Sequence, residues 1–331
     1  MATKVRQLAE ATPNSSHPNP LISHDKLRQL YSMMLKCRLL DQRARMLRMQ
    51  AGFEDDRYSS VGLEATAVGA AIDLRPTDTV GPSYRDFMLG YLKGMPLTII
   101  FAQFYGHNSR ASTGRVPHGD SQYSRLNIVL PTSTVAAQLN RCTDIALANQ
   151  RAKNDHVVMA FLDEDSISLG ERHHALNFSG QQRLPIVFVR HASNLSARSA
   201  SVNIGSTGNG PSPEAVEYGF PTIAVDSSDA VAVYRVAQEA VERARCGGGA
   251  TLIEAETISG YEPTEMDRSH YQAADEVEES KSSDSIAAME RYLAGKDLFS
   301  EGWKKEIAAA FQEELEAAVD AVENDSCGVS A

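Results

Sequence analysis

Polar side chains that could bind a cation follow two apolar runs in the middle of the chain, residues 157–162 and 185–189. These polar residues are Asp163, Glu164 and Asp165 after the first run, and His191, Ser193 and Asn194 after the second. Carboxylate, amide and other neutral oxygens are the ligands that hard divalent cations prefer. Acids and serines also cap helices. The chemistry of this region therefore depends on whether the two polar segments meet.

Each apolar run has the length of a strand and ends in a polar turn. Residues 169–181, between the runs, have the pattern of a helix. The stretch therefore predicts a strand–helix–strand unit with parallel strands and a right-handed crossover. Because ligands of open α/β sheets bind beyond the carboxyl ends of the strands, the two polar segments are expected side by side, facing one crevice.

Two short segments of this unit match a known family. Residues 174–178 read His-Ala-Leu-Asn-Phe, and residues 184–188 read Leu-Pro-Ile-Val-Phe. The stretch resembles the alpha subunit of thiamine-diphosphate-dependent 2-oxoacid dehydrogenases, the first components of the pyruvate and branched-chain complexes. The resemblance is closest to the branched-chain members. It runs from about residue 24 to about residue 295, which is most of the chain.

The resemblance implies a fold, an activity and partners. The fold is α/β, of the thiamine-diphosphate-binding type, with a mostly parallel sheet flanked by helices. The activity is the oxidative decarboxylation of a 2-oxoacid with acyl transfer to lipoamide, and it uses thiamine diphosphate and Mg²⁺. The family's alpha subunit works with a separate beta subunit in an α₂β₂ heterotetramer, beside a lipoyl-bearing acyltransferase.

The cofactor motif of the family is degenerate in this chain. The family has Gly-Asp-Gly or Gly-Glu-Gly at the first turn, where this chain has Asp163, Glu164 and Asp165. Glu164 takes the position of the metal carboxylate. The two aspartates add negative charge beside a polyanion, and like charges about 4 Å apart cost about 4 kcal/mol at an effective dielectric constant of about 20. Three interpretations of residues 163–165 remain open: they only cap a helix, they bind a metal ion directly, or they form a working thiamine diphosphate site.

The second turn departs from the family as well. Ser193 takes the position of the second asparagine of a pair, and Asn194 could replace it as a metal ligand if the loop shifts. His191 takes the position of a diphosphate-binding arginine of branched-chain members. Arg190 is one position early and is predicted to point to the other face of the sheet.

Other cofactor residues are carried over from matching motifs. Tyr84 and Arg85 match a Tyr-Arg pair whose arginine lies on the diphosphate, and the planar guanidinium suits this task. The alternative is a surface pair at the start of a helix. Ser133 and Val135 match positions that hold the diphosphate and prop the bent cofactor, and Gln138 matches one that orders the loop.

His118 is the candidate catalytic residue. It matches the histidine of the family's Gly-Arg-x-Met-Pro-x-His segment, after one deletion. A loop histidine can move protons or stabilise a developing oxyanion, although a solvated histidine is the alternative. The family's reaction-centre histidine has no counterpart in residues 257–263. Asp144 takes the position of a glycine at which two helices touch, so that a rearranged contact is expected.

Two classes of function therefore remain: a divergent 2-oxoacid dehydrogenase subunit with impaired cofactor binding, and a catalytically silent homologue that acts in assembly or regulation. In either class we expect a wide apolar face that is buried against the beta subunit.

Composition narrows the class of protein. The chain has 331 residues and a net charge of −11, which argues against nucleic-acid binding. No apolar run approaches the length of a membrane span, and four scattered cysteines suit a cytoplasmic protein. We expect a flexible tail over residues 1–22, one α/β domain with C-terminal helices over 23–325, and a short tail over 326–331.

Periodicity and turn signals predict further elements outside the central unit. These are helices over residues 24–50, 59–72, 131–153, 284–294 and 301–323, and a strand–helix–strand unit over residues 220–260 whose capping region begins at Asp226.

Overall fold

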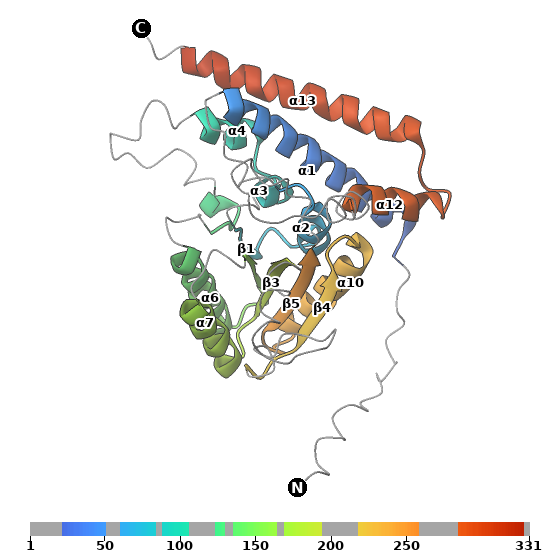
Figure 1. Ribbon diagram of the computed structural model, residues 1–331. Coiled ribbons are helices and arrows are strands. Elements are labelled where there is room, and N and C mark those ends of the chain that lie inside the picture. The colour runs from blue at the N-terminus through green and yellow to red at the C-terminus, as the bar shows by residue number, and fades with distance from the viewer. Residues whose placement is uncertain are drawn as a thin grey trace, which may run out of the picture.

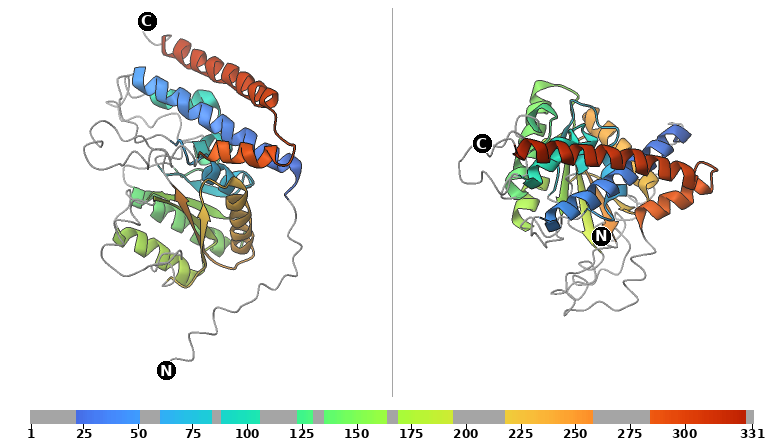
Figure 2. Two further views of the ribbon diagram at one scale, coloured as in Figure 1. Left: turned by 45° about the vertical axis from the view of Figure 1, so that its right-hand side comes forward. Right: turned by 90° about the horizontal axis from the view of Figure 1, so that it is seen from above.

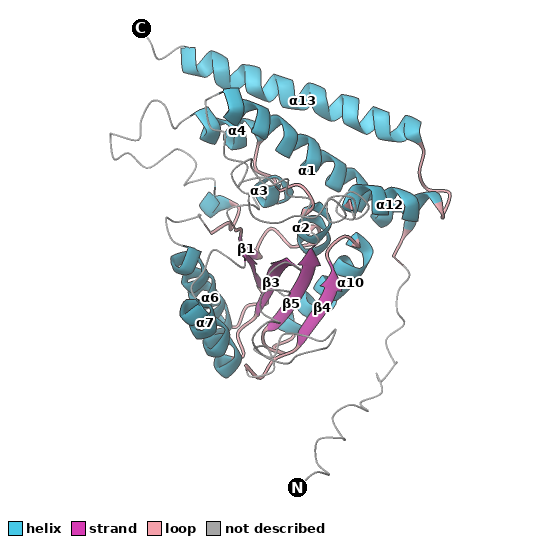
Figure 3. Cartoon of the chain, in the orientation of Figure 1, coloured by secondary structure: helices cyan, strands magenta, loops and turns pink. Residues whose placement is uncertain are grey.

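The computed structural model describes residues 22–50, 60–83, 88–105, 123–129, 135–163, 169–193, 218–257 and 284–327. Within them a parallel sheet forms the centre of the fold, in the strand order β1-β2-β3-β5-β4 (Figures 1 and 3). Its strands are β1 (Thr79–Gly81), β2 (Val158–Asp163), β3 (Ile186–Ser193), β4 (Thr222–Asp226) and β5 (Thr251–Thr257). All four neighbouring pairs run parallel. Helices cover both faces, as parallel sheets require, and the predicted α/β class is confirmed.

Alternate side chains of the strands enter two different apolar clusters. On β2, Val158 and Ala160 pack in a cluster with α6 (Val135–Ala152) and α7 (Leu169–Gln182). Met159 and Phe161 pack in the cluster on the opposite face. This alternation with a period of two fixes which residues of each strand face which helices. Figure 1 shows α6 and α7 on one side of the sheet and α10 on the other.

Helices α2 (Glu64–Ala71) and α10 (Ala230–Arg245) pack closely together on that opposite face. Every residue of α2 is buried, and most of its side chains are small. A Cβ atom on Gly69 would lie 3.0 Å from the carbonyl oxygen of Ala230 and from Cβ of Val233. The short side chains of α2 therefore permit the two helix backbones to approach.

A helical layer lies beyond the carboxyl ends of the strands (Figures 1 and 2). It contains α1 (His24–Gln50), α3 (Met88–Leu92), α4 (Leu97–Tyr105), α12 (Ser285–Ala294) and α13 (Glu301–Cys327). Helix α13 packs against α1 and α4. Tyr31 of α1 packs its ring on Trp303 with centroids 5.3 Å apart, and Arg43 of α1 pairs with Glu316 at 2.7 Å. Aromatic packing and ion pairing therefore hold the last helix on the first one.

A buried carboxylate joins α2 to two helices of this layer, α1 and α12. Glu64, at the start of α2, is fully buried and pairs with Arg38 of α1. The Ser285 hydroxyl donates to the same carboxylate at 3.0 Å, and the Gly62 backbone N–H donates to it at 2.9 Å. Arg38 also pairs with Asp284, which caps α12. The negative charge of Glu64 is thus matched by donors from three segments, as a buried ion requires.

Several predicted elements are confirmed, and some details differ. The helix predicted over residues 24–50 is α1, and both strand–helix–strand units are present. Strand β3 continues past the apolar run to Ser193. The capping region predicted to begin at Asp226 is confirmed, because Asp229 accepts the backbone N–H groups of Val231 and Ala232, and Asp226 accepts the backbone N–H of Ser228. In the described chain, no helix is both long and apolar enough to cross a bilayer.

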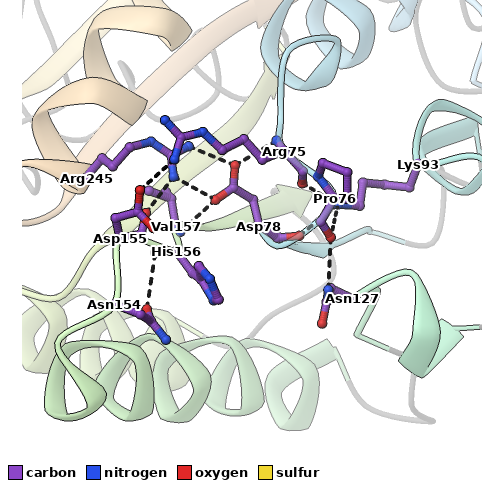
Figure 4. Close-up of polar contacts among 10 residues, drawn as sticks. All are labelled: Arg75, Pro76, Asp78, Lys93, Asn127, Asn154, Asp155, His156, Val157 and Arg245. Atoms are coloured by element: carbon purple, nitrogen blue, oxygen red, sulfur yellow. Dashed lines mark hydrogen bonds and ion pairs between the residues drawn. The ribbon is translucent and has the colours of Figure 1, made fainter.

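At the amino ends of the strands, the carboxylate of Asp78 is fully buried and accepts four hydrogen bonds (Figure 4). Arg245, from the last turn of α10, binds it through Nη1 at 3.1 Å and Nη2 at 2.8 Å. The backbone N–H groups of Val157 and Arg75 donate to it at 2.9 Å and 2.8 Å. Lys93 donates to the Asp78 carbonyl at 2.8 Å. This cluster joins α10 to the segments that enter β1 and β2.

Replacing Asp78 with alanine should lower the free energy of unfolding by about 3–5 kcal/mol, because Arg245 would keep a largely buried charge without its carboxylate partner. Urea denaturation followed by circular dichroism measures this loss. The control is Arg75→Gln, which breaks an exposed pair with Asp155 and should cost less than about 1 kcal/mol. Equal losses in the two variants would show that the buried pair has no special role.

Candidate functional site

The carboxyl ends of β2 and β3 lie side by side. Asp163, the last residue of β2, is in register with His191 of β3, and Ser193 at the end of β3 is in register with Thr257 of β5. The polar segments that follow β2 and β3 therefore leave the same edge of the sheet. The parallel register of the two strand ends confirms the predicted strand–helix–strand unit, while the turns themselves lie outside the described residues.

His191 is packed against the apolar core. Its side chain is 3% exposed, and its ring stacks on Phe161 with centroids 6.1 Å apart and an interplanar angle of 29°. Phe161 and the neighbouring Val189 belong to the cluster on the α10 face of the sheet. The imidazole thus occupies a crowded apolar position close to the carboxyl edge.

Arg190 points to the other face, as predicted, and pairs with a carboxylate there. Its Nη1 lies 3.0 Å from Oε1 of Glu254, which is directly opposite in the register of β3 and β5. The two side chains are 14% and 6% exposed. A guanidinium that is this buried and already paired with a carboxylate is a poor anchor for a phosphate, because a phosphate would have to compete with Glu254.

Gln138 connects α6 to the segment that leaves β1. Its buried Nε2 donates to the carbonyl oxygen of Pro82, two residues before Tyr84. Next to it, Gly81 leaves room for Cys142, since a Cβ atom on Gly81 would clash with Sγ. Burial raises the pKa of the Cys142 thiol to about 12, so that this cysteine stays protonated and acts as an apolar side chain. Gln138 thus fixes the backbone that leads to the Tyr84–Arg85 pair.

Most of the candidate residues lie outside the described residues. These are Tyr84, Arg85, His118, Ser133, Glu164 and Asn194. Val135 begins α6 and Ser193 ends β3, and for these two the backbone alone is described. The roles expected for them remain predictions. Among the side chains that are described, no three His, Cys, Asp or Glu residues are grouped as a metal site would need.

Glu254, the partner of Arg190, was not predicted from the sequence. The signal was present, because Arg190 and Glu254 are single charged residues inside the apolar runs 186–192 and 252–255. Opposite charges in neighbouring buried strands often pair directly across the sheet. Recognising the pair required the order of the strands, which places β5 beside β3 although β4 precedes it in the chain.

The chain belongs to the dehydrogenase E1 component family, whose model matches residues 31–328. It is 33% identical over 290 residues to the 3-methyl-2-oxobutanoate dehydrogenase subunit alpha of Mycobacterium tuberculosis, covering 87% of this chain and 76% of the relative. It is 33% identical over 301 residues to the 2-oxoisovalerate dehydrogenase subunit alpha of Bacillus subtilis, covering 89% and 90%. The pyruvate dehydrogenase E1 component subunit alpha of Staphylococcus epidermidis is 29% identical over 311 residues, covering 92% and 80%. These matches confirm the predicted family.

The family depends on thiamine diphosphate. At the edge where its diphosphate would lie, the described residues fit it poorly. Position 191, where the resemblance implies a diphosphate-binding guanidinium, holds a buried imidazole, and the adjacent Arg190 is paired with Glu254 on the other face. Strong binding of a diphosphate needs charge-assisted donors that are free to point at it.

Replacing Gln138 with leucine should destabilise the protein by about 1–3 kcal/mol, because the carbonyl oxygen of Pro82 loses a buried donor. Backbone amides near Pro82 should also exchange with deuterium faster than in the parent. The matched control is Gln150→Leu in the same helix, whose exposed amide donates to Gln182 and Arg183. If the two leucine variants were equally stable and exchanged alike, the role of Gln138 in ordering this segment would be wrong.

Proposed function

We propose that this chain serves as the alpha subunit of a 2-oxoacid dehydrogenase first component, and that its own site binds thiamine diphosphate weakly. The complete enzyme would decarboxylate a 2-oxoacid oxidatively and transfer the acyl group to lipoamide. The matches to alpha subunits that act on branched-chain 2-oxoacids and on pyruvate support the lineage. The poor fit at positions 190 and 191 supports the weak binding.

A second candidate is a catalytically silent homologue that acts in assembly or regulation. The substitutions favour it. Asp163 and Asp165 stand where the family has glycines, and Ser193 stands where it has an asparagine. In both candidates the scaffold is retained and the partner is a beta subunit, with a lipoyl-bearing acyltransferase as a further partner. Both place one domain over residues 23–325 of a cytoplasmic protein.

The apolar face expected at the beta subunit stays a prediction. Among the described residues, three large apolar side chains are prominently exposed: Met46 and Met49 on α1, and Tyr292 on α12. The described surface thus offers scattered apolar contacts. An interface made with these residues would combine them with polar contacts.

Thiamine diphosphate should bind the chain in complex with its beta partner with a Kd weaker than about 0.1 mM, even with Mg²⁺ in excess. The reason is the negative charge of Asp163 and Asp165 together with the lost arginine at position 191. Isothermal titration calorimetry measures this affinity, and the Bacillus subtilis relative titrated alongside is the positive control. Micromolar binding by this chain would contradict the proposed weak binding of thiamine diphosphate. It would not affect the proposal that the chain is an alpha subunit.

Restoring the family residues should recover cofactor binding. The variant combines Asp163→Gly, Glu164→Asp, Asp165→Gly and Ser193→Asn. Each gain is about 1–3 kcal/mol, so that the affinity for thiamine diphosphate should improve by about a hundredfold or more. Decarboxylation should stay slow, because no residue replaces the reaction-centre histidine.

The control for this variant removes two negative charges far from the crevice, by Glu239→Gln and Glu306→Gln on exposed positions of α10 and α13. This control should leave the affinity for thiamine diphosphate unchanged. That result would exclude a general effect of net charge on cofactor binding. A fourfold variant that melts like the parent and binds no better would show that the crevice itself has changed shape.

A further inference from the structure

A lysine side chain ends among three backbone carbonyl oxygens at the amino ends of the strands. Nζ of Lys93 lies 2.9 Å from the carbonyl oxygen of Arg75, 3.3 Å from that of Pro76 and 2.8 Å from that of Asp78. We call these three oxygens the carbonyl cage. Figure 4 shows the Lys93 side chain reaching the turn that carries them.

The carbonyl cage belongs to a turn that other contacts hold in place. The Asp78 backbone N–H donates to the carbonyl oxygen of Arg75 at 3.0 Å, and the Arg75 backbone N–H donates to the Asp78 carboxylate at 2.8 Å. Pro76 takes the second position of this turn, where its fixed φ is favourable. Nδ2 of Asn127 also donates to the Pro76 carbonyl at 2.9 Å (Figure 4). The cage is therefore fixed by contacts that do not involve Lys93.

The backbone of Lys93 is fixed as well. It follows the last residue of α3, and its N–H donates to the carbonyl oxygen of Leu89 at 3.0 Å. The side chain thus connects the end of α3 to the turn before β1. It joins the two ends of residues 78–93, a stretch whose sequence includes Tyr84 and Arg85.

The cage has the chemistry of a site for a large monovalent cation. Lys26 and Lys304 pair with carboxylates, whereas Lys93 donates to carbonyl groups. Burial lowers the pKa of the Lys93 ammonium group, because this cation has lost contact with water. Backbone carbonyl oxygens replace the lost hydration of K⁺ in the same way in selectivity filters. Mg²⁺ and Ca²⁺ need oxygen ligands closer, at about 2.0–2.6 Å.

We propose that the carbonyl cage is a binding site for a monovalent cation of the size of ammonium or potassium, and that Lys93 fills it with the ammonium group of the chain itself. Lys93 is half-buried, so that water can complete the shell of a free ion once the side chain is shortened. The parent then needs no added ion, and a variant without the ammonium group takes one up. The site lies at the edge of the sheet opposite the candidate cofactor residues and does not depend on their function.

Shortening Lys93 and supplying the ion tests the site through thermal melting of the full chain, followed by circular dichroism at neutral pH and constant ionic strength. In tetramethylammonium chloride, whose cation is bulky and has no N–H donor, Lys93→Ala should melt about 2–5 °C below the parent. In KCl and in NH₄Cl it should regain at least about half of this loss, because the ion binds the folded state alone. The parent should melt alike in the three salts.

Two control variants separate the cage from general effects of salt. Lys93→Met keeps a long side chain beside the carbonyl oxygens, so that it should lose stability and gain nothing from K⁺. Lys26→Ala removes an ammonium group that pairs with Asp73 at 2.7 Å, and it should melt alike in the three salts. Thallium(I) NMR gives a direct measurement, since Lys93→Ala should bind Tl⁺ and release it to KCl, while Lys93→Met should not.

Three results would overturn the proposal. The first is that Lys93→Ala melts at the same temperature in all three salts. The second is a gain in KCl that Lys93→Met or Lys26→Ala shares. The third is that Lys93→Ala and a second short variant, Lys93→Ser, both stay unfolded in KCl, because an ion in the cage should hold the turn as Lys93 does.

Discussion

The buried carboxylate of Asp78 is the contact on which the arrangement of the sheet depends. A charge without access to water must be matched by donors, and here they come from Arg245 at the end of α10, from the backbone before β2 and from the backbone of Arg75. With the last turn of α10 held at this edge, β5, which begins at Thr251, enters the sheet beside the same ends as β1 and β2. The carboxyl ends of the strands consequently gather at the opposite edge.

A second buried charge has the same role at that opposite side. Glu64 binds Arg38, Ser285 and the backbone of Gly62, so that α1, α2 and the start of α12 are tied to one carboxylate. Removing any donor would leave the carboxylate undersatisfied, which makes alternative packings of these helices costly. The two carboxylates join elements at opposite edges of the sheet, while the apolar clusters bury side chains on both of its faces.

Much of this fold could be predicted from apolar periodicity, since α1, α10 and the central strand–helix–strand unit have clear patterns. Strand β1 could not, because three residues give no alternation to recognise. The capping region of α10 could be predicted, but its capping residue could not, because Asp226 and Asp229 both precede the helix. Backbone geometry decides between them, and Asp229 has the extended conformation, with φ −92° and ψ 90°, that aims its side chain at the first turn. The pairing of Asp78 with Arg245 joins residues that are far apart in sequence and leaves no local signal.

At the site, the sequence predicted that β2 and β3 are parallel neighbours and that Arg190 points to the other face of the sheet. It did not predict that Arg190 pairs with Glu254. Turning the Arg190 side chain to the face of His191 would cost much of the packing free energy of β3. Sliding β3 by one residue to bring Arg190 to the position of His191 would turn every side chain of the strand over. Val187 and Val189 would leave the α10 cluster, and Phe188 would leave the α6 cluster. The apolar pattern of β3 therefore also keeps the Arg190 guanidinium beside Glu254, on the face opposite His191.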